Sequence, residues 1–291
     1  MNKSEQLDII HKDIQKRIFE WYLREKIRTK KSEKPEGTIV KFIAFLQGRI
    51  PVKPRDVYYS VELKEKISKE SNENPQFKHV KDFEQAFVEG QNMNQYLSKR
   101  ANDPNFPDYL RYAWGIYHLH LEEIQENKSK PGTAKQRTPL LMCIIDETSV
   151  CFVDTVSHPK TAADFMNIDL LKVIKNNGWM SRIGFGENLN FTVVEKIETN
   201  EDLFDLYKNG INVPFQFDGT CYVGFSLMSS RAPYSAVRSF CNMNKLIMKN
   251  ILDDKLEYVG FEFSCDDGGE TSWVIIMKNE TEYIRYTVYK T

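Results

Sequence analysis

The stretch "YAWGIYHLHLEE", residues 112–123, holds two of the five histidines of the chain, one residue apart. On a β-strand, residues i and i+2 point to the same face, so His118 and His120 would address one ligand. Leu119 and Leu121 would then point to the core on the other face. An imidazole with its ordinary pKa of about 6.5 can accept or donate a proton near neutral pH. The spacing therefore predicts a strand that carries a pair of acid–base groups.

Other residues could complete a site for a phosphodiester. Arg111 precedes the pair and would hold a phosphate, with Tyr117 or Lys160 assisting. In "DTVSHPK", His158 and Lys160 follow an expected strand, which brings His158 toward the pair if the strands form a meander. Such groups would take a proton from a 2′-hydroxyl, protonate the leaving oxygen and balance the charge on phosphorus. The candidate catalytic residues are His118, His120, Arg111, Tyr117, His158 and Lys160.

Two other interpretations of the histidine pair stay open. A pair of histidines on a half-exposed strand can be ordinary surface with no chemistry attached. The H-x-H spacing also occurs in metal sites, and His158, Asp146 or Asp154 could complete the ligand set. Zinc sites usually have ligands at closer spacing, so we expect neither a bound metal nor another cofactor.

The elements that must position these residues are mostly helical at first. In residues 4–31 and 77–90, apolar residues recur at spacings of three and four, which is typical of amphipathic helices. We expect a further helix over 56–67. Two prolines make 100–108 a loop that leads into the histidine stretch.

The pattern then changes to short alternating or apolar runs. Strands are expected at 117–122, 139–146 and 149–156, and a short helix ends at Gly178. A long amphipathic helix and an antiparallel meander follow near the C-terminal end. The sequence thus predicts an α+β protein with a helical N-terminal region, a central small antiparallel β-meander and a C-terminal α+β domain with antiparallel strands. Their expected bounds are 1–110, 111–185 and 190–291.

The composition limits the class of protein. The chain has 291 residues, of which 41% are hydrophobic, so a sizeable core is expected. The net charge of −1 argues against a general coat of positive charge, although a local basic patch stays compatible with it. No apolar run approaches the roughly 18 residues of a membrane span, and the first residues lack the apolar core of a signal peptide. We therefore expect no membrane partner. Five scattered cysteines favour a reduced, cytoplasmic setting.

Longer stretches carry a resemblance to a known group of proteins. "NQYLSKRANDPNFPDYLRYAWGIYHLHLEE", with "PLLMCIIDETSVCFVDTVSHP" and "LLKVIKNNGW", resembles uncharacterised bacterial and mobile-element proteins whose recurring pattern is W-G-I-H-H-L-H-L. The matching residues are Trp114, Gly115, Ile116, His118, Leu119, His120 and Leu121. Tyr117 stands where the pattern has its first histidine. If that histidine is the catalytic one, the resemblance implies an impaired site in this chain.

Residues 80–180 are also distantly similar, in element order, to the core of RelE-type ribonuclease toxins. In that family, helices precede a β-meander whose strands carry Arg, Lys, Tyr or His for RNA cleavage. The resemblance implies an RNA substrate for the central part of the chain. It leaves the C-terminal third without an assignment.

Together these observations predict a metal-independent endoribonuclease of the toxin or phage-defence type. Its partners would be nucleic acid, with RNA preferred, and a protein partner or inhibitor. The alternative is a non-catalytic subunit of a defence or mobile-element system that binds or senses nucleic acid or protein. An enzyme should gather His118, His120 and basic groups in one open cleft. A binding subunit should bury the imidazoles or scatter them.

Overall fold

The structure is a computed structural model of the whole chain. It describes residues 3–25, 27, 33–70, 76–98, 101, 103–106, 108–121, 139–187, 197, 199–209, 211, 213–224, 234–251, 256–265, 271–279 and 281–290. Within these ranges the chain is of the α+β class, as expected, with eight α-helices and ten strands that pair mostly in antiparallel fashion.

The chain divides into two compact units, each built from separate stretches of sequence. The first unit comprises Met1–Pro51, Arg100–Phe106 and Arg231–Thr291, and the second comprises Val52–Lys99 and Pro107–Ser230. These bounds differ from the three consecutive parts expected at 1–110, 111–185 and 190–291. The difference arises because pairing and packing join segments that are far apart in the sequence.

A four-stranded sheet with the order β1-β4-β3-β2 forms the centre of the second unit. The expected antiparallel meander is present as β2 (Ile116–His120), β3 (Leu140–Ile145) and β4 (Ser149–Val156). The first strand, β1 (Asp56–Tyr59), pairs parallel to β4 and so draws an early segment into this unit. Our expectation of a helix over 56–67 is therefore wrong for its first residues.

The strand β1 forms where the local pattern alone favoured a helix, because the sheet offers it a partner. The ring of Tyr59 packs at 5.2 Å from the ring of Phe152 on β4. Ser60 then ends the strand, since its hydroxyl donates to the Val153 carbonyl oxygen at 2.6 Å and accepts the Leu63 N–H at 2.9 Å. This bond caps the helix that follows, α3 (Val61–Glu70).

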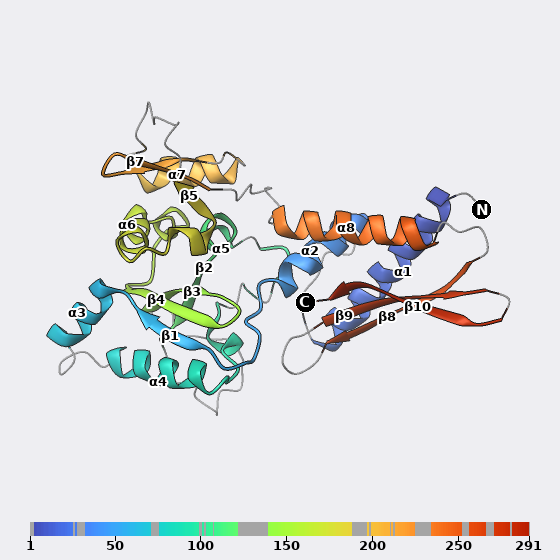
Figure 1. Cartoon of the computed structure of the whole chain (residues 1–291), viewed down its shortest axis with the longest axis horizontal. Coiled ribbons are helices and arrows are strands. Elements are labelled where there is room, and N and C mark those ends of the chain that lie inside the picture. The colour runs from blue at the N-terminus through green and yellow to red at the C-terminus, as the bar shows by residue number, and fades with distance from the viewer. Residues whose placement is uncertain are drawn as a thin grey trace. The chain divides into compact units, whose positions relative to one another are not determined.

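Helices cover both faces of the four-stranded sheet (Figure 1). The helices α3 and α4 (Gln76–Val88) lie on one face, where Phe87 packs against Phe152 at 6.0 Å. The other face carries α5 (Tyr109–Trp114) and α6 (Ile168–Asn176), whose apolar residues share one core with Met142 and Ile144 of β3. Both faces of the sheet are therefore buried.

A second, three-stranded sheet of the same unit has the order β5-β7-β6. The Trp114 indole N–H donates to the Tyr207 hydroxyl at 3.1 Å, and this buried bond ties α5 to α7 (Asn200–Lys208). The short 3₁₀ helices of the unit are η1 (Asn94–Tyr96), η3 (Ala163–Phe165) and η4 (Met180–Ile183). The strands of the small sheet are β5 (Phe185–Glu187), β6 (Phe215–Phe217) and β7 (Thr220–Gly224).

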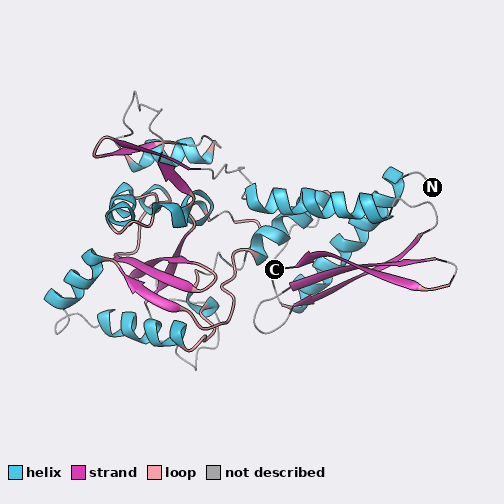
Figure 2. Ribbon diagram, viewed as in Figure 1, coloured by secondary structure: helices cyan, strands magenta, loops and turns pink. Residues whose placement is uncertain are grey.

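The first unit packs helices against one face of an antiparallel sheet with the order β10-β9-β8 (Figure 2). Its core joins the apolar face of α1 (Ile10, Ile14, Ile18 and Tyr22) to Trp273, Ile275 and Met277, which alternate along β9. The N-terminal helices therefore share a core with the C-terminal strands. Its elements are α1 (Lys3–Arg24), α2 (Pro35–Leu46), α8 (Tyr234–Ile251), β8 (Glu257–Cys265), β9 (Thr271–Lys278) and β10 (Tyr283–Lys290).

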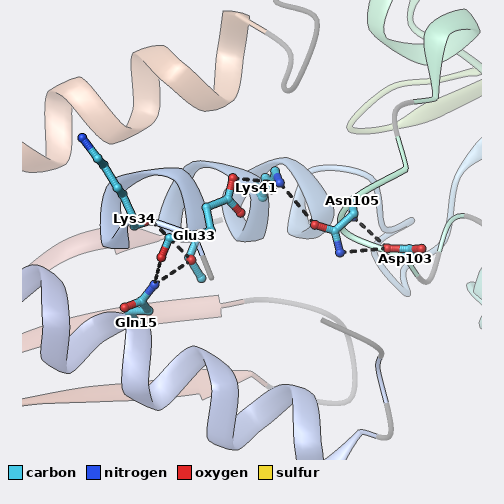
Figure 3. A network of polar contacts seen from close by, with 7 residues as sticks. Gln15, Glu33, Lys34, Lys41, Asp103 and Asn105 are labelled. Atoms are coloured by element: carbon cyan, nitrogen blue, oxygen red, sulfur yellow. Dashed lines mark hydrogen bonds and ion pairs between the residues drawn. The ribbon is translucent and has the colours of Figure 1, made fainter. Parts of the chain in front are cut away.

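A polar network fixes the segment that precedes α5 to this first unit (Figure 3). The Lys41 ammonium forms an ion pair with Glu33 at 2.8 Å and donates to Asn105 Oδ1 at 3.2 Å. Asp103 Oδ1 accepts the Asn105 backbone N–H at 2.8 Å, and Gln15 donates to the Glu33 carbonyl oxygen at 2.9 Å. Asp103 and Asn105 are thus held to α2 within the first unit.

Two glycines offer a matched test of the packing around the sheet. Gly90 and Gly178 follow α4 and α6, and both have a φ of +70°. A Cβ at Gly178 would meet open space, whereas a Cβ at Gly90 would lie 2.6 Å from the Pro54 nitrogen. We expect Gly178→Ala to cost about 1–2 kcal/mol of unfolding free energy from its left-handed backbone. Gly90→Ala should cost about 1–3 kcal/mol more because of the clash.

Urea denaturation of the two variants measures this difference directly. Equal losses at the two positions would show that the segment carrying Pro54 does not lie against Gly90.

Candidate functional site

The histidine strand follows directly from the short helix α5. The Asp108 side chain caps α5, because its Oδ1 accepts the Arg111 backbone N–H at 3.1 Å. Gly115 ends the helix in the left-handed region with a φ of +65°, where a glycine costs least. The chain then enters β2, which among the described strands pairs with β3 alone and so lies at the edge of the sheet. Cap and turn together set which face of the sheet each residue of β2 occupies.

The alternation expected for "YHLHL" is confirmed. His118 pairs with Met142 and His120 pairs with Leu140 on β3, so both imidazoles lie on one face. Their ring centroids are 6.3 Å apart. Leu119 on the opposite face is completely buried, and Leu121 is 4% exposed.

A third imidazole reaches the pair through the β3–β4 hairpin. Leu140 pairs with His120 on one side and with Val156 on the other, and His158 follows Val156 by two residues. The rings of His120 and His158 are 5.7 Å apart. The ring of Phe165, in η3, contacts the imidazoles of both His118 and His158, with ring centroids 5.0 Å and 6.1 Å away. We call His118, His120 and His158 the histidine cluster.

Burial and mutual repulsion keep two of these imidazoles neutral near pH 7. Desolvation, together with the nearby His118 and His158, lowers the pKa of His120 to about 4. Desolvation also lowers the pKa of His118, as do His158 and Arg111, while Asp108 acts in the opposite direction. An anion placed among these rings would favour their charged forms and raise both pKa values.

His118 is the most enclosed member of the cluster. Its side chain is 11% exposed, and its buried Nδ1 atom has no hydrogen-bond partner. Asp108 Oδ2 lies 3.8 Å from that nitrogen, too far for a hydrogen bond but close enough to favour a proton on Nδ1. His118 is therefore placed to support its neighbours and not to meet a ligand first.

His158 has a defined tautomer when it is neutral. Its Nδ1 lies 2.9 Å from the Pro159 carbonyl oxygen, which can only accept, so Nδ1 must carry the proton. The lone pair then sits on Nε2, for which the described part of the chain provides no hydrogen-bond partner. His158 thus presents a proton acceptor.

A pocket of about 350 Å³ opens beside His158. Lys160, which is exposed, also lines it, and its backbone N–H donates to Asp164 Oδ2 at 3.0 Å. Thr161 donates its backbone N–H to the same oxygen at 2.8 Å, and these bonds lower the pKa of the Asp164 carboxyl. The lining residues are Met142, Val156, Ser157, His158, Pro159, Lys160, Asp164, Asn167 and Leu170.

The structure therefore brings four of the six candidates together and separates two. His118, His120 and His158 form the cluster, and His158 shares the pocket with Lys160. Tyr117 lies on the opposite face of β2, because adjacent strand residues alternate. Burial raises the pKa of Tyr117, so its phenol is a poor proton donor or acceptor at neutral pH. Our expectation that Tyr117 assists the histidines does not fit this placement, because the pleat of the strand turns it away from them.

Arg111 lies near the buried end of the cluster and does not line the pocket. Its guanidinium sits 5.0 Å from the ring centroid of Tyr112, and its charge helps to lower the pKa of His118. Of the two basic candidates, Lys160 lines the pocket and Arg111 does not.

The sequence analysis missed four residues that shape the site: Asp108, Asp164, Phe165 and Asn167. The sequence pattern around Asp164 offered one clue. Thr161 and Asp164 are three residues apart, and each side chain accepts a backbone N–H of the other, as in a capping box. Phe165 and Asn167 belong to the same turn, and no local pattern links that turn to β2.

Within the described ranges, no three His, Cys, Asp or Glu side chains are arranged so that they could hold a metal ion.

Among the helices that the structure describes, none has the length and apolar character to cross a membrane.

Comparison of the chain with protein-family models, with curated proteins and with solved structures finds no match. The chemistry of the site must therefore be argued from its own residues.

The lowered pKa of His120 predicts how stability depends on pH. Between about pH 6.5 and pH 4 the unfolded chain binds a proton at this residue and the folded chain does not. The free energy of unfolding should therefore fall as the pH decreases through this window. Replacing His120 by Gln should remove about 1 kcal/mol of that fall at pH 5, a value reduced from full linkage because the imidazole is partly exposed.

Urea denaturation at pH 7 and pH 5 tests this expectation. His79→Gln on α4, away from the cluster, is the control for the substitution itself. The same pH dependence in His120→Gln as in the wild type would contradict a neutral His120.

Proposed function

We propose that this protein is an endoribonuclease that cleaves RNA by histidine acid–base catalysis, without a metal ion. The observation that carries the proposal is the meeting of His120 and His158, 5.7 Å apart, beside a pocket that Lys160 also lines. His158 and Lys160 line the cavity, and His120 lies outside its lining, 5.7 Å from His158. Two imidazoles and a cation are the groups that phosphodiester transfer requires. The resemblance to RelE-type toxins in the sequence supports the same reaction class.

In this mechanism His158 acts as the general base. Its Nε2 accepts the proton of the ribose 2′-hydroxyl, while Nδ1 stays bonded to the Pro159 carbonyl oxygen. The 2′-oxygen attacks phosphorus, and the bond between phosphorus and the 5′-oxygen breaks. The products are a 2′,3′-cyclic phosphate and a free 5′-hydroxyl.

His120 acts as the general acid once the substrate is bound. In the free protein it is neutral, because its pKa is held at about 4. The bound phosphodiester raises that pKa, so His120 takes a proton from solvent and delivers it to the leaving 5′-oxygen. His118 and Asp108 orient His120 from the buried side, and they are positioning residues in this account.

Lys160 offsets the negative charge that develops on the phosphorus oxygens. Its ammonium forms no hydrogen bond or ion pair with another residue of the described ranges, so it is available to a ligand. It lies close enough to Asp164 to lower the pKa of that carboxyl. A preorganised cation at this point stabilises the transition state more than the ground state.

One observation favours a second candidate function. His118 is nearly enclosed, which is the geometry expected of a non-catalytic subunit that binds nucleic acid or a protein. In that case the cluster would serve packing, and RNA would bind without being cut.

Cleavage of a labelled RNA by the purified full chain separates the two functions. For the ribonuclease, His120→Ala and His158→Ala should each lower the rate by about 10²–10⁴-fold, the usual contribution of one general acid or base. His79→Ala is the matched control and should leave the rate unchanged, as should a chelator. The melting temperatures of all variants verify that they fold.

The rate should also show a bell-shaped dependence on pH, since one imidazole must be neutral and the other charged. An intact labelled RNA after incubation with the wild type would contradict the proposal, as would full activity in both cluster variants.

A further inference from the structure

The lining of the pocket beside His158 is of two kinds. Met142, Val156 and Leu170 contribute apolar side chains from β3, β4 and α6. His158, Lys160, Asp164 and Asn167 contribute polar groups, and most of these come from the turn between β4 and α6. A pocket that is partly apolar with a few converging polar groups is the usual form of a small-molecule site.

The polar groups have hydrogen-bonding capacity that the fold does not use. Asp164 accepts two backbone N–H groups on Oδ2, and the Thr161 side chain also hydrogen-bonds to its carboxylate, which leaves part of the acceptor capacity of the two oxygens unused. Asn167 accepts the Asp169 N–H on Oδ1 to cap α6, and its Nδ2 donates to no described residue. The remaining acceptor capacity of Asp164 and the free amide donor of Asn167 thus belong to the same pocket lining as Lys160 and His158.

The size of the pocket limits what it can hold. A volume of about 350 Å³ is at the lower end of the range for small-molecule sites, roughly 300–1,000 Å³. It suits one nucleotide unit and not a longer stretch of RNA. The apolar side chains would cover the faces of a base, while a donor and an acceptor would meet its polar edge.

We propose that this pocket binds the single nucleoside on the 5′ side of the scissile phosphate, with its 3′-phosphate at Lys160 and its 2′-hydroxyl at His158. The inference rests on the proposed ribonuclease function and adds to it the position of the substrate. Placing the 2′-hydroxyl at His158 follows from its Nε2, which has no hydrogen-bond partner in the described part of the chain, and from the place of His158 in the pocket lining. The base then extends toward Met142, Val156 and Leu170.

The placement predicts a preference between isomers of the same ligand. A ribonucleoside 3′-monophosphate has the base, sugar and phosphate of the nucleotide on the 5′ side of the cleaved bond. Its base should fill the pocket while its phosphate contacts Lys160. A 5′-monophosphate carries its phosphate on the wrong side of the sugar. Inorganic phosphate lacks the base and its apolar contact.

Isothermal titration calorimetry with the full chain tests this preference. The probes are the four ribonucleoside 3′-monophosphates, their 5′ isomers and inorganic phosphate. At least one 3′-monophosphate should bind about tenfold more tightly than its 5′ isomer and than inorganic phosphate. Lys160→Met should weaken the binding of the 3′-monophosphate and of inorganic phosphate by the same factor, because each ligand loses only its phosphate contact.

A pair of tryptophan variants places the ligand in the pocket. Ser157 lines the pocket and is exposed, so Ser157→Trp fills it without disturbing the core. Ser181→Trp is the control, because Ser181 is an exposed serine of the same unit away from the pocket. Ser157→Trp should abolish the tenfold preference, and Ser181→Trp should keep it.

The outcomes separate this inference from the ribonuclease itself. If the wild type cleaves RNA but binds no 3′-monophosphate more tightly than its 5′ isomer, the pocket assignment is overturned and the proposed ribonuclease function is retained. Tight 3′-monophosphate binding without RNA cleavage would support the pocket and overturn the ribonuclease. An unchanged preference in Ser157→Trp, with the variant folded by its melting temperature, would overturn the assignment as well.

Discussion

The candidate site depends on the register of the β2–β3–β4 meander. Leu140 pairs with His120 on one side and with Val156 on the other, and this double pairing brings His158 to the histidine strand. A slip of β2 by one residue would turn both of its imidazoles to the opposite face. The α5 cap at Asp108, the turn at Gly115 and the buried Trp114–Tyr207 bond all help to hold that register.

Crowding three imidazoles against Phe165 has an electrostatic consequence. A protonated imidazole here would lose its contact with water and would be repelled by a second protonated imidazole beside it. The pKa of His120 is therefore lowered to about 4, and the pKa of His118 is lowered as well. His118 and His120 are thus neutral near pH 7 when the cluster is empty, and a bound anion would favour their charged forms. Binding of an anion at such a cluster would therefore change the protonation of its imidazoles.

The sequence predicted the parts of the fold that depend on local pattern. The alternation of "YHLHL", the hairpin of β3 and β4 and the helix ended by Gly178 are all confirmed. The α+β class is confirmed too, since it follows from the same patterns. These features need no knowledge of distant partners.

The features that the sequence did not predict depend on long-range pairing. The strand β1 forms only because β4 offers it a parallel neighbour, and the first compact unit combines segments from opposite ends of the chain. In the site, His158 could be placed near the pair by assuming a meander, whereas the turn with Asp164 and Asn167 could not. Tyr117 was expected to assist the histidines, but closeness in sequence does not decide which face of a strand a residue occupies.

The central claim is that His120 is neutral in the free protein and becomes charged when a phosphate enters the cluster. Nuclear magnetic resonance of the imidazole nitrogens, titrated against pH with and without a ribonucleoside 3′-monophosphate, measures this directly. The account predicts a His120 pKa of about 4 in the free protein and a clear rise in the bound state. A His120 that titrates near 6.5 in the free protein, or that keeps its pKa when the nucleotide is bound, would contradict it.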